Sequence, residues 1–230
     1  LGMDYAYVHD NTTAAAFVAV TAGNDTTINI DSCYAGANVT LKSANAGAIR
    51  GYAGRFSDAS DLSCGGSITN CYSLATTIGT VSTGIAAYNW EKSANQLTIS
   101  NCYNANGPIS GHDCEYYVAS KNNYQSVAGL LAEGVTTISA EDMQGDAALT
   151  NMSALNNYGN YYVATDTYPA LSVFKGIKVT PIWDGSVAQP KDSDSDGVYE
   201  ITNGAELAYV ISTGGGEGNY YKLTSDIYLN

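Results

Sequence analysis

Short runs of alternating apolar and polar residues extend along most of the chain, separated by turns rich in asparagine, glycine, serine and aspartate. Alternation with a period of two predicts half-buried β-strands, because a helix needs apolar residues three and four positions apart. The frequent turn residues predict that these strands are short. The pattern therefore predicts an all-β protein.

The alternating runs recur as an internal repeat. Three copies of one motif, at residues 30–34, 68–72 and 99–103, begin with Ile and end with Cys-Tyr. An apolar stretch of small residues precedes each copy, and residues 126–131 form a fourth, degenerate stretch. One such unit cannot bury its own apolar face, so stacked copies with isoleucine over isoleucine and cysteine over cysteine are expected. This predicts a β-solenoid over residues 1–176.

The repeat resembles a known family. Glycine- and alanine-rich stretches alternate with a strand such as Ile99-Ser100-Asn101-Cys102-Tyr103-Asn104, which is similar to the GLUG-type repeats of bacterial cell-surface proteins. The similarity continues through residues 137–143 and 154–156 and ends at residues 168–171. The resemblance implies a right-handed parallel β-helix. It also implies an extracellular place in an adhesin or in the non-catalytic region of an IgA-cleaving peptidase.

Composition and charge restrict the partners. The chain has 230 residues, of which 22 are acidic and 9 basic, giving a formal net charge of -13. Nucleic acid is an unsuitable partner, because phosphate binding needs clustered lysine and arginine. The sequence lacks an apolar run of about 20 residues, so no membrane span is predicted. Tyrosine is abundant, with 19 residues, and it suits β-structure.

The five cysteines divide into two groups. Cys33, Cys71 and Cys102 belong to the repeat, where a small inward side chain suits a stacked ladder, so they are expected to be buried thiols. Cys64 and Cys114 lie in insertions and could form a disulfide. Zinc is disfavoured because no Cys-x-x-Cys pair is present, and a nucleophilic Cys114 beside His112 lacks an identifiable partner group.

An acidic segment near the end of the chain predicts a cation site. It reads Asp192-Ser193-Asp194-Ser195-Asp196-Gly197-Val198-Tyr199-Glu200. Acids at positions 1, 3, 5 and 9, glycine at 6 and a backbone carbonyl at 7 match the first part of a calcium loop. The predicted metal ligands are Asp192, Asp194, Asp196, Val198 (through its carbonyl) and Glu200. Position 12 is Asn203, so the loop is expected outside an EF-hand. A solvated acidic linker is the alternative.

The sequence pattern changes after residue 176, where the predicted solenoid ends. Residues 177–183 resemble a strand, residues 197–201 another, and Asn203 is expected to cap a short helix over residues 205–211. A last strand is expected over residues 220–229. This order predicts a second, small α+β unit at 177–230, and it resembles the opening segment of a further β-helix in bacterial surface proteins.

Three functions remain in competition. The first is a non-enzymatic extracellular module, an adhesin or stalk stiffened by calcium, whose host or matrix ligand is a glycan or protein. The second is a subunit that assembles head to tail through the open ends of the solenoid. The third is a carbohydrate-binding or carbohydrate-active β-helix. Its candidate residues are exposed tyrosines and Trp90 or Trp183 for stacking on sugar rings, and acids such as Asp58, Asp61, Asp113 and Glu115 for acid–base chemistry.

Overall fold

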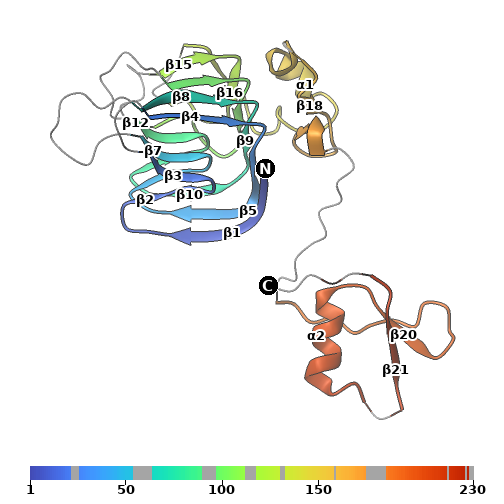
Figure 1. The fold of residues 1–230 in the computed structure, drawn as a ribbon. Coiled ribbons are helices and arrows are strands. Elements are labelled where there is room, and N and C mark those ends of the chain that lie inside the picture. Colours follow the sequence, from blue (N-terminus) through green and yellow to red (C-terminus); the bar gives the residue numbers. More distant parts are fainter. Residues whose placement is uncertain are drawn as a thin grey trace. The chain divides into compact units, whose positions relative to one another are not determined.

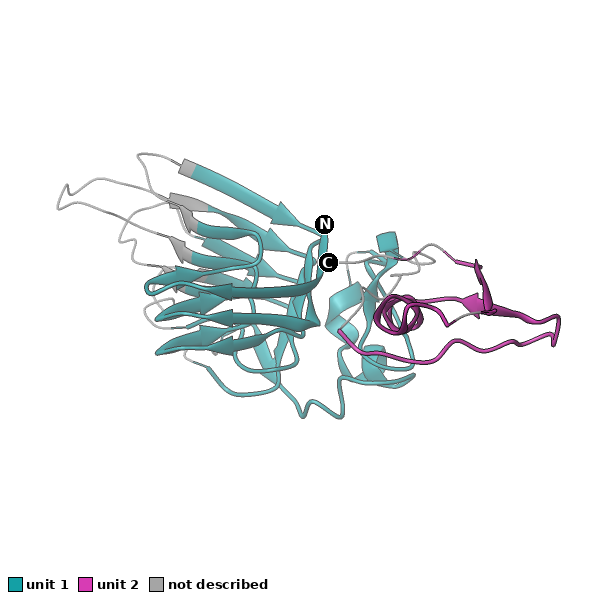
Figure 2. Cartoon of the chain, turned by 90° about the horizontal axis from the view of Figure 1, so that it is seen from below, with its two compact units in different colours: residues 1–175 teal, residues 176–230 magenta. Residues whose placement is uncertain are grey.

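The computed structural model describes residues 1–21, 26–53, 64–89, 97–111, 118–129, 133–157, 159–174, 185–216, 218–225 and 227. The chain divides into two compact units, residues 1–175 and 176–230 (Figure 2). This division falls one residue before the boundary expected from the sequence. Most elements are strands, and most of these strands form parallel sheets (Figure 1). The prediction of an all-β protein is confirmed.

Four parallel sheets make up most of unit 1, and successive passes of the chain add strands to them (Figure 1). The first contains β1 (Gly2–His9), β5 (Tyr34–Lys42), β9 (Tyr72–Ser73), β14 (Tyr103–Asn104), β16 (Asn123–Gln125) and β17 (Val135–Thr137), with β10 (Thr76–Ile78) also paired to β5. The second contains β2 (Thr13–Ala14), β6 (Asn45–Gly47) and β11 (Val81–Thr83). The third contains β3 (Val18–Thr21), β7 (Arg50–Ala53) and β12 (Ala86–Asn89). The fourth contains β4 (Thr26–Asp31), β8 (Cys64–Thr69), β13 (Leu97–Ser100) and β15 (Val118–Lys121).

The repeat motif forms the corner between the fourth sheet and the first. Ile30, Ile68 and Ile99 are paired in register across three strands, and all three are buried. The residue before each cysteine has a positive φ, and at Asn70 and Asn101 it is 52° and 54°. Asparagine tolerates this left-handed conformation better than other residues with a side chain. The motif therefore specifies both the buried isoleucine and the turn that follows it.

Asparagine side chains also join one corner to the next. The Asn70 amide donates to Asp31 at 2.7 Å, and the Asn101 amide donates to Asn70 at 3.2 Å. The Asn122 amide continues the series by donating to Asn101 at 3.3 Å. Each corner thus positions its neighbour through a side-chain hydrogen bond at the turn.

The fourth corner was missed by sequence analysis. Residues 122–124 read Asn-Asn-Tyr, without the cysteine of the motif, yet Asn122 has the positive φ of the earlier corners and Tyr124 pairs with Tyr103. Asn123 occupies the cysteine position, accepting from the Cys102 amide at 2.9 Å and donating to the Ile99 carbonyl at 2.8 Å. Cys71 makes the equivalent pair of contacts in an earlier corner, at longer distances. Asparagine can replace cysteine here because it has both a donor and an acceptor.

The three repeat cysteines are buried free thiols, as predicted. They pack with the isoleucines in one apolar cluster of the core. Burial raises the pKa of the Cys71 thiol well above its usual value, so this thiol stays protonated and unreactive. Cys64 begins β8, whereas Cys114, its expected disulfide partner, lies outside the described residues.

The tyrosines that follow the cysteines form a stack. The rings of Tyr34 and Tyr72 lie 5.0 Å apart at 5°, and those of Tyr72 and Tyr103 lie 5.0 Å apart at 2°. The last part of unit 1 packs against this stack (Figure 1). It consists of α1 (Ala148–Asn151), the 3-10 helix η1 (Ser153–Asn156), the antiparallel pair β18 (Tyr162–Val163) and β19 (Ala170–Leu171), and the 3-10 helix η2 (Ser172–Phe174). These repeat tyrosines are therefore buried structural residues.

Unit 2 is a strand, a helix and a second strand. β20 (Val198–Ile201) and β21 (Tyr220–Leu223) are parallel, and α2 (Gly204–Thr213) connects them. The Asn203 side chain accepts a hydrogen bond from the Glu206 amide at 3.0 Å, which confirms the predicted cap. Gly214 ends the helix with a φ of 68°. The strand-like run at 177–183 lies outside the described residues, and β21 is shorter than the strand expected at 220–229.

Candidate metal centre

The acidic segment of unit 2 is a closed loop whose base is held by backbone pairing. The Glu200 amide donates to the Lys191 carbonyl at 2.9 Å, and these two residues form an antiparallel bridge. Ser195 and Gly197 have φ values of 61° and 85°, so the chain turns sharply within the loop. Glycine at this position allows the bend without strain. The loop therefore returns Glu200 to the side of the chain where the segment begins.

Carboxylates of the loop hold its backbone. Asp192 accepts from the amides of Asp196 at 3.2 Å and Gly197 at 3.0 Å. Asp196 accepts from the Val198 amide at 2.8 Å, and this hydrogen bond lowers the pKa of the Asp196 carboxyl. Glu200 accepts from the Ser193 amide at 2.7 Å, which lowers the pKa of Glu200 in the same way. These hydrogen bonds thus favour the charged forms of Asp196 and Glu200 and hold both carboxylates in position.

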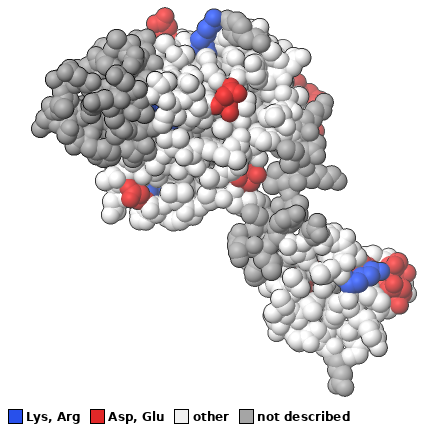
Figure 3. Space-filling view, in the orientation of Figure 1, with Lys and Arg blue, Asp and Glu red and all other residues white. Residues whose placement is uncertain are grey.

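The loop brings four of the predicted ligands together. One carboxylate oxygen from each of Asp192, Asp194, Asp196 and Glu200 lies within 4.8 Å of the others. Acidic side chains gather at one end of unit 2, with a basic side chain against them (Figure 3). Such a group of carboxylates could hold a metal ion. Val198, the fifth predicted ligand, begins β20 directly beside them, and its amide is bound to Asp196.

Lys222 is the residue of this site that sequence analysis missed. Its ammonium lies 3.1 Å from Glu200, 3.5 Å from Asp196 and 3.7 Å from Asp194. The Glu200 carboxylate is the main cause of a raised Lys222 pKa. Sequence spacing carries no signal for this contact, because Lys222 reaches the loop only through the pairing of β21 with β20, where Glu200 lies opposite Lys222.

Lys222 neutralises part of the charge that the loop concentrates. Like charges this close repel one another, and a cation among them relieves the repulsion. An ammonium carries one positive charge, whereas a divalent metal ion carries two and accepts several oxygen ligands at once. A divalent metal ion in the loop would therefore offset more of this negative charge than Lys222 does.

The other candidate residues are not placed. Trp90 and Trp183, the acids Asp58, Asp61, Asp113 and Glu115, and the pair His112 and Cys114 all lie outside the described residues. Among the residues that the structure describes, the four acids of the loop are the group suited to hold a metal ion.

Comparisons of the chain with protein-family models, with curated proteins and with solved structures find no match. Within the described part of the chain, none of the helices has the length and apolar character needed to span a membrane.

Proposed function

We propose that this chain is a non-enzymatic module of an extracellular surface protein. In this proposal residues 1–175 form a right-handed parallel β-helix that acts as a spacer or presenting scaffold, and calcium binds the acidic loop of unit 2. The observation that carries the proposal is the register of the repeat, in which corner follows corner in parallel strands.

The use of the side chains supports a structural role for unit 1. Asp31, Asn70, Asn101 and Asn122 bond to one another along the corners, and the cysteines and tyrosines stack inside or beneath the last segment. Side chains that repeat in this way serve stacking, because each unit of a repeat protein depends on its neighbours. Such a stack repeats one structural unit in a single direction, which suits a spacer at a surface.

Calcium is the metal that suits the loop best. It prefers six to eight oxygen ligands, many of them carboxylates, in a flexible arrangement. Asp192 at position 1 already binds the amides at positions 5 and 6, so the loop is bent around its first carboxylate. Magnesium demands a stricter octahedral geometry and gives up water reluctantly. Extracellular calcium sites typically have dissociation constants of about 10⁻⁴ to 10⁻³ M, and we expect a dissociation constant in this range for the exposed loop.

Thermal unfolding of the full chain in calcium and in chelator tests the metal. Calcium should raise the melting temperature of unit 2, because an ion that binds only the folded state stabilises it. Asp194→Ala should abolish the shift, and Asp166→Ala, an exposed acid in unit 1, should keep it. Equal melting temperatures in calcium and chelator would overturn the assignment.

The proposed extracellular location needs a test of its own, separate from the test of the metal. Intact cells of the source organism, treated briefly with an external protease and probed with antibodies against this chain, should lose the antigen. An internal cytoplasmic protein should remain intact in the same sample. An antigen that survives until the cells are lysed contradicts an extracellular module.

A further inference from the structure

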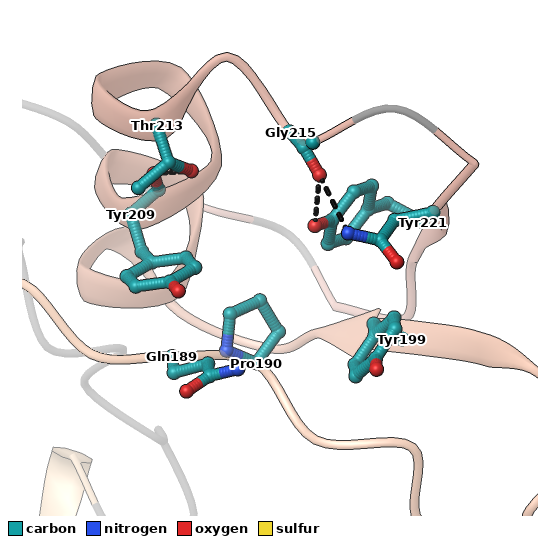
Figure 4. Close-up of a pocket in the computed structure, with 9 residues that line it drawn as sticks. Gln189, Pro190, Tyr199, Tyr209, Thr213, Gly215 and Tyr221 are labelled. Atoms are coloured by element: carbon teal, nitrogen blue, oxygen red, sulfur yellow. Dashed lines mark hydrogen bonds between the residues drawn. The ribbon is translucent and has the colours of Figure 1, made fainter.

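A small cavity in unit 2 is lined by three tyrosines. It has a volume of about 120 Å³ and lies between α2 and the two strands (Figure 4). Tyr199 comes from β20, Tyr221 from β21 and Tyr209 from α2. Pro190 lies at one end, between Tyr209 and Tyr199 (Figure 4). We call this cavity the tyrosine pocket.

The alternation of the two strands explains how the pocket and the acidic loop share the same elements. Tyr199 lies opposite Tyr221, and Glu200 lies opposite Lys222 in the next pair. Successive residues of a strand point to opposite faces, so the tyrosine pair and the charged pair face opposite ways. The tyrosine pair shares its face with Ile201, which is buried. One face of this small sheet therefore serves the loop, and the other serves the pocket.

The walls of the pocket are held in place before any ligand arrives. The rings of Tyr199 and Tyr221 lie 5.6 Å apart. The Tyr221 hydroxyl and the Asn219 amide both donate to the Gly215 carbonyl (Figure 4). The Gly215 amide donates to Val210 at 2.9 Å, which joins this turn to the helix. A site whose groups are already ordered loses less entropy on binding.

Several polar groups of the pocket remain available to a ligand. Within the described part of unit 2, the hydroxyls of Tyr199 and Tyr209 and the side-chain amide of Gln189 make no hydrogen bond. Tyr199 and Tyr209 are half-buried, so each presents a ring face and a hydroxyl together. Ring faces beside amide and hydroxyl groups suit a ligand with apolar C–H faces and hydroxyls at its edge. A pyranose ring has this chemistry.

The size of the tyrosine pocket and the charge of unit 2 restrict the class of ligand further. Pockets for drug-sized ligands measure about 300 to 1,000 Å³, so this one accepts a single ring. Acidic residues outnumber basic ones in unit 2, and Lys222, which lies on β21, is already paired with the loop. A uronate or sialate would be repelled by this charge. We propose that the tyrosine pocket binds one neutral pyranose residue of a glycan.

This proposal adds a ligand class to the proposed function. It rests on the proposed function in one respect, namely that the sugar is bound and not cleaved. The carbohydrate-binding hypothesis drawn from the sequence assigned stacking to exposed tyrosines and to Trp90 or Trp183, without naming any tyrosine, whereas this proposal names the three tyrosines of the pocket. The tyrosines that stack in unit 1 are buried, whereas those of the tyrosine pocket are accessible.

Saturation-transfer NMR on the full chain in calcium chloride tests the assignment. Methyl β-D-galactopyranoside and methyl β-D-glucopyranoside are the neutral probes, and D-glucuronic acid is the acidic comparison. At least one neutral probe should receive saturation, and the acid should not. Transfer to neither neutral probe, or to glucuronic acid alone, overturns the proposal.

Two variants locate the binding. Tyr209→Ala removes the pocket wall that α2 contributes and should weaken binding of the responding probe roughly tenfold. Tyr220→Ala is the matched control, because Tyr220 lies on β21, is 70% exposed and does not line the pocket. Circular dichroism confirms that both variants fold. Equal binding by Tyr209→Ala and the unaltered chain overturns the site. The calcium shift in melting temperature, measured on the same samples, reports separately on the proposed function.

Discussion

Tyr162 joins the last segment of unit 1 to the stacked corners. Its hydroxyl lies 2.6 Å from the Asn101 carbonyl and 3.2 Å from the Cys71 carbonyl, and the side chain is buried. The Cys71 carbonyl also accepts from the Tyr103 amide at 3.2 Å, so it keeps a partner without Tyr162. In Tyr162→Phe, the Asn101 carbonyl loses the hydroxyl and stays buried beneath the ring. This carbonyl therefore determines the cost of the substitution.

The expected loss follows from these contacts. A hydrogen bond contributes about 0.5–1.5 kcal/mol net, and a buried acceptor without a partner costs about 1–3 kcal/mol. We expect Tyr162→Phe to lower the free energy of unfolding of unit 1 by about 2 kcal/mol. For a unit of this size the melting temperature should fall by about 4–8 °C.

Differential scanning calorimetry of the full chain measures the change. Tyr161→Phe is the control, because Tyr161 is adjacent and half-buried, and its hydroxyl makes no hydrogen bond with the described residues. Its melting temperature should change by less than about 2 °C. If the two variants lose the same stability, the Tyr162 hydroxyl does not hold the segment to the stack, and the reasoning is refuted.

Three further predictions concern the loop, the corners and the buried tyrosines. Lys222→Met should strengthen calcium binding in isothermal titration calorimetry, because it removes a cation that competes with calcium for the acidic loop. Lys191→Met is the control and should not strengthen it. Unchanged calcium affinity in Lys222→Met would contradict competition between Lys222 and calcium. In urea unfolding, Asn70→Ala should be less stable than Asn70→Gly by about 1 kcal/mol, because alanine is strained at a φ of 52° and glycine is not. A more stable Asn70→Ala would exclude backbone strain as the cause of the difference. Burial raises the pKa of Tyr103 and Tyr162 well above the usual 10.0, so both stay protonated in the folded chain while the unfolded chain ionises. The contribution of each of these two tyrosines to the free energy of unfolding should therefore be constant below about pH 9 and fall above about pH 10 by roughly 1.4 kcal/mol per pH unit. Urea unfolding at increasing pH should show a smaller slope in Tyr103→Phe, and an equal slope would refute this origin.

Local patterns predicted much of the fold because they act over a few residues. The alternation of apolar positions predicted strands, and the recurring Ile-x-Asn-Cys-Tyr predicted the stacking of isoleucines, whereas the positive φ at Asn70 and Asn101 was found only in the structure. Asn203 predicted the start of α2. In each case one short segment contains the whole physical cause.

The fourth corner shows where a local pattern fails. At Asn123 the motif letter changes, yet the contacts of the cysteine position are kept, because amide and thiol both meet a donor and an acceptor of the previous corner. A comparison of the repeats by sequence recognises this position only by its residue type. The equivalence is a property of the neighbouring backbone, which only the stacked arrangement supplies.

The candidate site divides in the same way. Sequence alone determined that Asp192, Asp194, Asp196 and Glu200 lie in one tight turn, because the spacing of the acids and Gly197 specify it. Tertiary structure decided that Lys222 neutralises the loop and that Tyr199, Tyr209 and Tyr221 form a pocket behind it. Both depend on β21 returning beside β20 in one register, with Glu200 opposite Lys222. That register brings together residues more than twenty positions apart, and strand pairing across the intervening helix sets it.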